Sequence, residues 1–263
     1  REFDDVLAEA QALGYAEADP TFDVEGIDAA HKLTILASLA FGIPLQFDKC
    51  YTEGISRIEP QDVAYAEEFG YRIKHLGFTR RAGKGIELRV HPTLIPERRL
   101  IANVDGVMNA VLVQGDAVGP TLYYGAGAGS LPTASAVVAD IIDVTRTLTI
   151  DPENRVPHLA FQPGELSDMP VLSMDDVVTA YYLRMTVEDR PGVLAAVSGI
   201  LSEHGISIEA MQQKEPAEGE TQVPLVMLTQ SVSESQMNAA LGGIEVLDSV
   251  AGDVTRIRVE QLS

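Results

Sequence analysis

Cysteine and basic residues are scarce in this sequence, and each scarcity excludes a class of protein. The only cysteine is Cys50, so no disulfide can form within the chain, and the chain fits a reducing compartment such as the cytoplasm. Lysine and arginine number 19 against 39 aspartates and glutamates, which gives a formal net charge of −20 at pH 7. We therefore expect no nucleic-acid or anionic-membrane partner, because both attract basic surfaces.

Long apolar runs and metal-binding spacings are also missing. No apolar stretch is long enough to span a bilayer, and residues 1–5 lack the apolar core of a signal peptide. The five histidines are scattered, and none stands at a metal-ligand spacing from another histidine or from cysteine. We expect no membrane span and no metal site. We interpret Cys50 as a packed thiol and not as a nucleophile, since no base is recognisable near it.

What remains is the composition of a globular protein of one large or two ordinary domains. The 263 residues are 46% hydrophobic and 22% charged, which is normal for such a chain. Prolines and weak periodicity set one internal segment apart from its neighbours. We expect a first domain over 1–150, a proline-rich linker or wrapping loop over 151–176, and a second domain over 177–263.

Periodicity predicts an α+β fold for the first domain, with helices and a mixed or antiparallel sheet. Residues 71–78 and 85–90 alternate between apolar and polar around a turn at 80–84, which predicts two adjacent antiparallel strands. Asp23 is a candidate N-cap for a long helix that Gly42 ends. The predicted helices are 4–13, 24–41, 60–68 and 133–146, and the further strands are 107–113 and 120–124.

The second domain has the order βαββαβ, with one added final strand, which is a ferredoxin-like arrangement. Its predicted helices are 193–203 and 234–241, and its predicted strands are 181–187, 206–213, 223–229, 244–250 and 255–259.

Asp28 and Lys32 form the first candidate constellation. They are four residues apart, so on a helix they share a face. A lysine at the start of an apolar helix suits acid/base work if burial lowers its pKa, although a neighbouring carboxylate opposes that shift. The competing interpretation is a structural ion pair. The balance between these two effects is not decided by the sequence.

A glycine-rich turn forms the second constellation. Gly125, Gly127 and Gly129 lie between a predicted strand and a predicted helix. The run is not the Gly-x-Gly-x-x-Gly fingerprint of dinucleotide-binding domains. It is explained either by close packing of the turn or by a backbone that lies against the face of a cofactor, where side chains would be in the way.

The third constellation resembles the ACT domain, a small amino-acid-sensing module. The string Leu183 to Leu194 contains Asp-Arg-Pro-Gly-Val-Leu and matches that module's first strand, turn and helix start. Ser202 to Ile208 matches the end of its first helix and its second strand. Free amides at such a helix start can hold a carboxylate. The candidate effector contacts are Asp189, Arg190, Gly192, Val193 and Ile208; alternatively, the domain only pairs subunits.

Together, these strings occur in the order seen in homoserine dehydrogenase, which the whole chain resembles. The resemblance rests on segment 14–32 with Gly-Tyr-x-Glu and Asp-x-x-x-Lys, on Val90 to Thr93, on Asn103 to Val111, and on 125–140. It implies that Lys32 is the catalytic lysine and Asp28 lies beside the reacting hydroxyl. It also implies substrate contacts for Glu17, Asp23 and Tyr15, and nicotinamide contacts for Gly129, Gly127 and Gly125.

The resemblance further implies an NAD- or NADP-dependent interconversion of aspartate semialdehyde and homoserine in a homo-oligomer, with threonine as the most plausible effector. Homoserine dehydrogenases begin with a Rossmann domain that this chain does not contain. We therefore expect a fragment that is inactive alone. Two alternatives remain: a non-catalytic amino-acid-sensing or dimerisation protein, and another ACT-bearing dehydrogenase, such as one acting on phosphoglycerate, which fits the tail but not residues 14–32.

Overall fold

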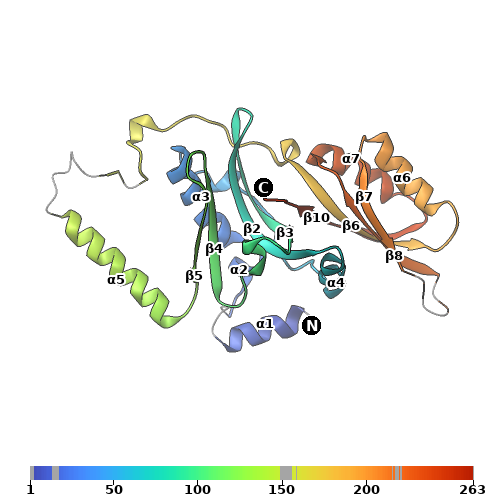
Figure 1. Cartoon of the computed structure of the whole chain (residues 1–263), viewed down its shortest axis with the longest axis horizontal. Helices are drawn as coiled ribbons and strands as arrows, with labels where there is room; N and C mark the ends of the chain where they lie inside the picture. Colours follow the sequence, from blue (N-terminus) through green and yellow to red (C-terminus); the bar gives the residue numbers. More distant parts are fainter. Residues whose placement is uncertain are drawn as a thin grey trace.

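The computed structural model describes residues 3–13, 18–148, 156–157, 159–214, 216, 219 and 221–262. The molecule is elongated, with the first domain in the middle and at one end and the second domain at the other end (Figure 1). An eight-stranded mixed sheet runs through both domains. Its main order is β1 (Tyr51–Thr52), β3 (Gly85–Pro96), β10 (Val250–Val259), β6 (Val178–Glu188), β8 (Gln222–Thr229) and β7 (Ile208–Gln213). Strand β2 (Tyr71–Ala82) pairs with β3, and β9 (Val232–Ser233) pairs with β6.

The first domain is built on a long β-hairpin. Strands β2 and β3 pair antiparallel over their whole length, and the turn between them uses Gly83 with a positive φ. This confirms the predicted strand pair and extends both members. The elements are α1 (Phe3–Ala12), α2 (Thr21–Val24), α3 (Ile27–Phe41), η1 (Phe47–Lys49), β1 (Tyr51–Thr52), α4 (Pro60–Glu68), β2 (Tyr71–Ala82), β3 (Gly85–Pro96), η2 (Leu100–Asn103), β4 (Met108–Gly115), β5 (Gly119–Ala126) and α5 (Ser130–Thr147).

The prediction of one helix over 24–41 is wrong at its start. Residues Thr21–Val24 form the separate short helix α2, and α3 begins only after Gly26, whose φ of 76° is left-handed. Asp23 therefore lies inside α2 and caps nothing. A left-handed residue cannot continue an α-helix, and glycine adopts that conformation at little cost. The predicted end at Gly42 is confirmed, since this residue has a φ of 63°.

Strands β4 and β5 and helix α5 extend away from the main sheet, at the left of Figure 1. The two strands form a separate two-stranded sheet. No residue of α5 is buried, although the helix carries many apolar side chains. Exposed apolar residues of this arm include Val111, Val113, Tyr123, Tyr124, Leu131, Val138, Ile141 and Val144. Exposed apolar patches of this kind mark protein-interaction, membrane or ligand-binding surfaces.

The second domain confirms the βαββαβ order, with one correction. The stretch 244–250 is not a strand: α7 continues to Ile244 and a turn leads into a single last strand. Apolar residues there complete the buried face of α7, which a strand pattern imitates over a few positions. The elements are β6 (Val178–Glu188), α6 (Val193–Glu203), β7 (Ile208–Gln213), β8 (Gln222–Thr229), β9 (Val232–Ser233), α7 (Glu234–Ile244) and β10 (Val250–Val259).

The sheet joins the two domains through β10 and β3. Arg258 and Val259 of β10 pair in parallel with Thr93 and Leu94 of β3, on the edge of β3 that β1 also uses. One hydrophobic core crosses the junction as well, and it contains Tyr65, Ala66 and Leu94 from the first domain with Tyr182, Val226, Leu228, Ile257 and Val259 from the second. The second domain is thus packed onto the first.

The described part of the proline-rich segment packs against the first domain. Residues Pro170 and Leu172 exchange backbone hydrogen bonds with Ile86, and Ser167 donates to the carbonyl of Gly42. It carries the short turns η4 (Pro163–Glu165) and η5 (Met174–Asp176). In the described residues, no helix combines the length and apolar character that crossing a membrane requires.

Candidate active site and effector loop

Asp28 and Lys32 meet on the first two turns of α3. Lys32 Nζ donates a hydrogen bond to Asp28 Oδ2, as their spacing predicts. The side chains are 69% and 45% exposed, so the pair is not buried within this chain. An exposed i,i+4 pair contributes at most a few tenths of a kcal/mol, roughly, to stability. This ion pair therefore adds little to the free energy of unfolding.

The surface around Lys32 is apolar. Ile35 and Leu36, three and four residues after Lys32 on α3, are 47% and 39% exposed. The His31 ring lies 4.0 Å from the ring of Phe47 and 6.3 Å from that of Phe22, between centroids.

The acidic residues predicted near the lysine are only partly described. Tyr15 and Glu17 lie outside the described residues. Asp23 lies in α2, four residues after Asp19, whose pKa is lowered by hydrogen bonds from the Thr21 side chain and backbone. Carboxylates on the segment that leads into α3 suit the ammonium group of an amino-acid substrate.

Gly125, Gly127 and Gly129 form the end of β5 and the entry to α5. A Cβ on Gly125 would meet no atom within 4 Å, whereas one on Gly127 would lie 1.3 Å from Asn109 Nδ2. Gly129 has a φ of 120°. Gly125 therefore borders open space, whereas Gly127 closely approaches Asn109 on β4. Between the described residues, no hydrogen bond connects this turn to α3.

The predicted effector loop borders a hollow at the start of α6. Gly192 has a φ of 95° and stands at the N-cap of that helix. Glu188, Asp189, Arg190, Gly192 and Val193 line the hollow, together with Gln213 and Leu225. Gln213 Nε2 donates to Asp189 Oδ1 at 3.3 Å, and Arg190 Nε donates to Glu188 Oε2 at 2.5 Å.

Ile208 is placed away from this hollow. It begins β7, pairs with Thr229 and packs against the core of the second domain. Gln213, at the other end of the same strand, lines the hollow instead. Strand β7 therefore borders the hollow through Gln213 at its far end and not through Ile208, and only the register of β7 shows which of its ends faces the loop.

Three buried arginines connect the domains, and sequence reasoning missed all of them. Arg184 of β6 binds Asp62 and Glu59 at the start of α4, with distances of 2.6 to 3.0 Å. Arg89 of β3 binds Glu260, just after β10. Arg258 of β10, 1% exposed, donates to Glu53 Oε2 at 2.7 Å. The partners in each pair are more than a hundred residues apart in the chain, so no local sequence pattern predicts these contacts.

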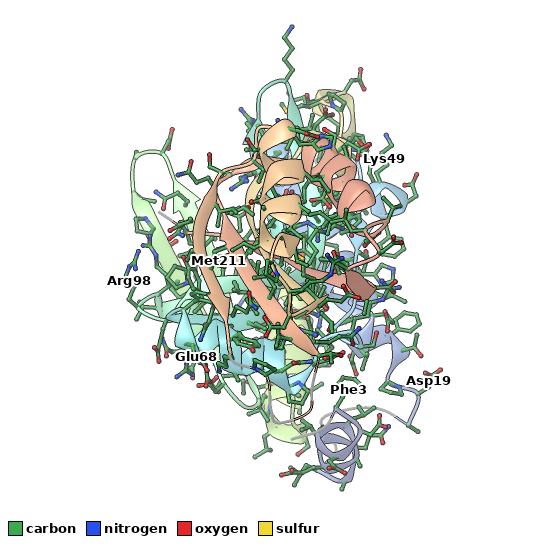
Figure 2. All side chains as sticks on the ribbon, turned by 90° about the vertical axis from the view of Figure 1, so that its right-hand side faces the viewer. Phe3, Asp19, Lys49, Glu68, Arg98 and Met211 are labelled. Carbon is green, nitrogen blue, oxygen red and sulfur yellow. The ribbon has the colours of Figure 1, made fainter. Side chains whose placement is uncertain are left out.

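A further contact between the domains lies on the surface. Gln212 and Lys214, at the end of β7, donate to the carboxylate of Glu68 on α4 at 2.5 and 2.6 Å. Figure 2 looks onto this end of the molecule and shows Met211 of β7 and Glu68 on the same face. The second domain thus contacts the first along both a strand and a helix.

Cys50 and His75 are held in uncharged forms. Burial raises the pKa of Cys50 to about 11, which agrees with the interpretation of a packed thiol. Burial also lowers the pKa of His75, whose Nε2 donates to the carbonyl oxygen of Glu53 at 2.9 Å. Since a neutral imidazole has one N–H, this bond fixes the tautomer of His75.

Fold and site together define a two-part protein, in which a site-bearing α+β domain shares its sheet with an ACT domain. The ACT family model matches residues 181–245, and the homoserine dehydrogenase family model matches residues 1–142. The chain belongs to the homoserine dehydrogenase family.

Relatives and solved structures agree with this family. The homoserine dehydrogenase of Pseudomonas aeruginosa is 67% identical over all of this chain and 61% of its own length. That of Neisseria gonorrhoeae is 58% identical over 99% of this chain and 60% of its own length. The crystal structure of a Thiobacillus denitrificans homoserine dehydrogenase, 68% identical, superposes with a TM-score of 0.92 over 99% of this chain and 59% of that one. The chain thus spans about three fifths of these relatives.

Proposed function

We propose that this chain supplies the substrate-binding and proton-transfer half of an NAD- or NADP-dependent homoserine dehydrogenase, which interconverts L-homoserine and L-aspartate 4-semialdehyde in the cytoplasm. The observation that supports it best is the Asp28–Lys32 pair, exposed on α3 within an apolar surface, in a chain that is 67% identical to a curated homoserine dehydrogenase. The pathway in which we place it leads to threonine and methionine.

In this proposal, Lys32 accepts the hydroxyl proton of homoserine, directly or through one water, and returns it in the reverse direction. Asp28 holds the lysine through the hydrogen bond between their side chains. Glu17, Asp23 and Tyr15 bind the substrate, with the carboxylates facing its ammonium group. The bound nicotinamide supplies the hydride chemistry, and Gly125, Gly127 and Gly129 form the backbone face beside it.

Gly125→Ala tests the glycine face, because a methyl group there meets no protein atom. In a full-length protein that contains this chain, we expect the free energy of unfolding to change by less than about 0.5 kcal/mol. We also expect dinucleotide affinity, measured by calorimetry, to fall by about tenfold, which is roughly 1.4 kcal/mol of binding energy. The matched control is Gly164→Ala, which also has open space. Unchanged affinity in Gly125→Ala would remove this face from the cofactor site.

The exposed apolar residues of β4, β5 and α5 support two proposed partners. We infer that the apolar side of α5 is covered by the nucleotide-binding part that the longer relatives contain, and that the apolar residues of β4 and β5 pair subunits in a homo-oligomer. The first inference is supported by α5, which has no buried residue. The second is supported by Tyr123 and Tyr124 of β5, which are more than half exposed.

The hollow at the start of α6 supports feedback regulation by an amino acid, with threonine as the proposed effector. Calorimetric titration of this chain with threonine should give saturable heat. Gln213→Ala, which removes the amide that lines the hollow, should weaken binding by about tenfold. Gly199→Ala, within α6 and with open space, should bind as the unaltered chain does. If neither threonine nor a related amino acid binds, the ACT domain serves only to pair subunits.

A further inference from the structure

The guanidinium of Arg258 bridges Glu234 of the ACT domain and Glu53 of the first domain. Its Nε donates to Glu234 Oε2 at the start of α7, at 2.9 Å. Its Nη1 donates to Glu53 Oε2, just after β1, at 2.7 Å. The Tyr51 hydroxyl donates to the same Glu53 oxygen at 2.8 Å. Because Arg258 is 1% exposed and Glu53 is 31% exposed, this contact is strong, and breaking it leaves a buried cation short of one partner.

The backbone of Glu53 is held from two further sides. Its N–H donates to the carbonyl of Val90 on β3 at 2.9 Å. Its own carbonyl accepts the 2.9 Å bond from His75 Nε2 on β2. The backbone of Glu53 is therefore held in place by two strands of the sheet. Its carboxylate accepts the hydrogen bond from Arg258.

The residues after Glu53 contact the end of α2, just before the glycine that precedes α3. A Cβ on Gly54 would be 2.2 Å from Glu25 Oε2, so no larger residue fits there without displacing that carboxylate. Ile55 N–H donates to the carbonyl of Val24 at 3.0 Å, and Ser56 Oγ donates to Glu25 Oε1 at 3.0 Å. Segment 54–56 thus fixes the two residues that precede Gly26.

Gly26 sets the direction in which α3 leaves this contact. Its φ is 76°, and a Cβ on it would lie 2.7 Å from His75 Cε1. Its carbonyl accepts the first hydrogen bond of the helix, from Ala30 N–H at 2.9 Å. Asp28 and Lys32 follow within the next two turns.

We propose that Glu53 is a positioning residue, through which Arg258 of the ACT domain fixes the direction of Asp28 and Lys32. The proposal rests on the function proposed above for those two residues. It gives the ACT domain a role in the site even without an effector, and it supplies a physical route for an effector: a shift of β10 or α7 moves Arg258, then segment 53–56, then the first turn of α3.

Glu53→Gln tests this with a change of one charge and almost no change of shape. In hydrogen exchange on this chain, we expect the amides of residues 24–32 to exchange roughly tenfold faster, because a charge-assisted bond that holds them is weakened. In a full-length protein, we expect kcat to fall by about tenfold, with the KM for the dinucleotide unchanged.

Glu59→Gln is the matched control. Glu59 also accepts from a buried ACT-domain arginine, Arg184, at 2.9 Å, but it stands at the start of α4. It should leave exchange over 24–32 and kcat within about twofold of the unaltered protein. Gly54→Ala provides a second test, since its methyl group crowds the Glu25 carboxylate and displaces segment 54–56 without adding or removing a charge, and it should reproduce the effect of Glu53→Gln.

The proposal is overturned if Glu53→Gln and Gly54→Ala accelerate exchange over 24–32 no more than Glu59→Gln does. It is also overturned if kcat falls equally in Glu53→Gln and Glu59→Gln. A full-length protein without homoserine dehydrogenase activity would contradict the proposed function instead, and the exchange measurement would still decide whether Glu53 positions α3.

Discussion

Lys32→Ala should lower the turnover of homoserine by about 10²-fold or more in a full-length protein that contains this chain, the usual scale for the loss of a positioned acid/base group. The fold should be preserved, since the Lys32 side chain is 69% exposed and its ion pair with Asp28 adds little stability. Steady-state rates and thermal unfolding, measured on the same preparation, check both parts.

Lys84→Ala is the control for this prediction, because Lys84 is also exposed but lies at the turn between β2 and β3. Its turnover should stay within about twofold of the unaltered protein. If Lys32→Ala keeps the unaltered turnover while the protein is folded, Lys32 is a surface residue and the assignment of the site is wrong.

Arg184→Met should have the largest effect on stability, about 3–5 kcal/mol in the free energy of unfolding. The substitution keeps an apolar stem. Among the described residues, it leaves the Asp62 carboxylate, which is 0% exposed, with the Tyr182 hydroxyl and the backbone N–H of Glu59 as its remaining donors. Urea unfolding of this chain measures the loss.

Arg190→Met is the matched control, since Arg190 also pairs with a carboxylate, that of Glu188, but is 58% exposed. Its removal should cost less than about 1 kcal/mol. An equally small loss for Arg184→Met would mean that the buried cluster does not hold the ACT domain against α4.

Local patterns predicted the elements whose ends carry their own signals. Helix α4 has the predicted bounds, because Pro60 opens it and Glu59 with Asp62 forms a capping box. Helix α6 also has its predicted bounds. The break at Gly26 was missed, because an apolar period that runs across a glycine looks like one helix until the φ of that residue is known.

Pairing between strands that are distant in the sequence could not be predicted from local patterns. Nothing near Arg258 in the sequence indicates that β10 lies beside β3, since parallel pairing between distant segments leaves no local signal. The spacing of Asp28 and Lys32 predicted their contact, because both lie on one helix. Glu53 and Arg258 are 205 residues apart, so their part in the site is visible only in the fold.

The family resemblance assigned roles that the geometry only partly covers. It named Glu17 and Tyr15, which lie outside the described residues, and it named Ile208, which packs into the core away from the hollow. The alternative of a non-catalytic sensor has no feature of the structure in its favour. A mere scaffold gains nothing from a lysine held by Asp28 on an exposed apolar surface.

The central claim is tested most directly by joining this chain to the part of the Pseudomonas aeruginosa relative that it does not cover and measuring nicotinamide reduction with L-homoserine. We expect reduction that saturates with homoserine and is lost in Lys32→Ala. A folded, dinucleotide-binding protein that reduces neither NAD nor NADP in the presence of homoserine would contradict it.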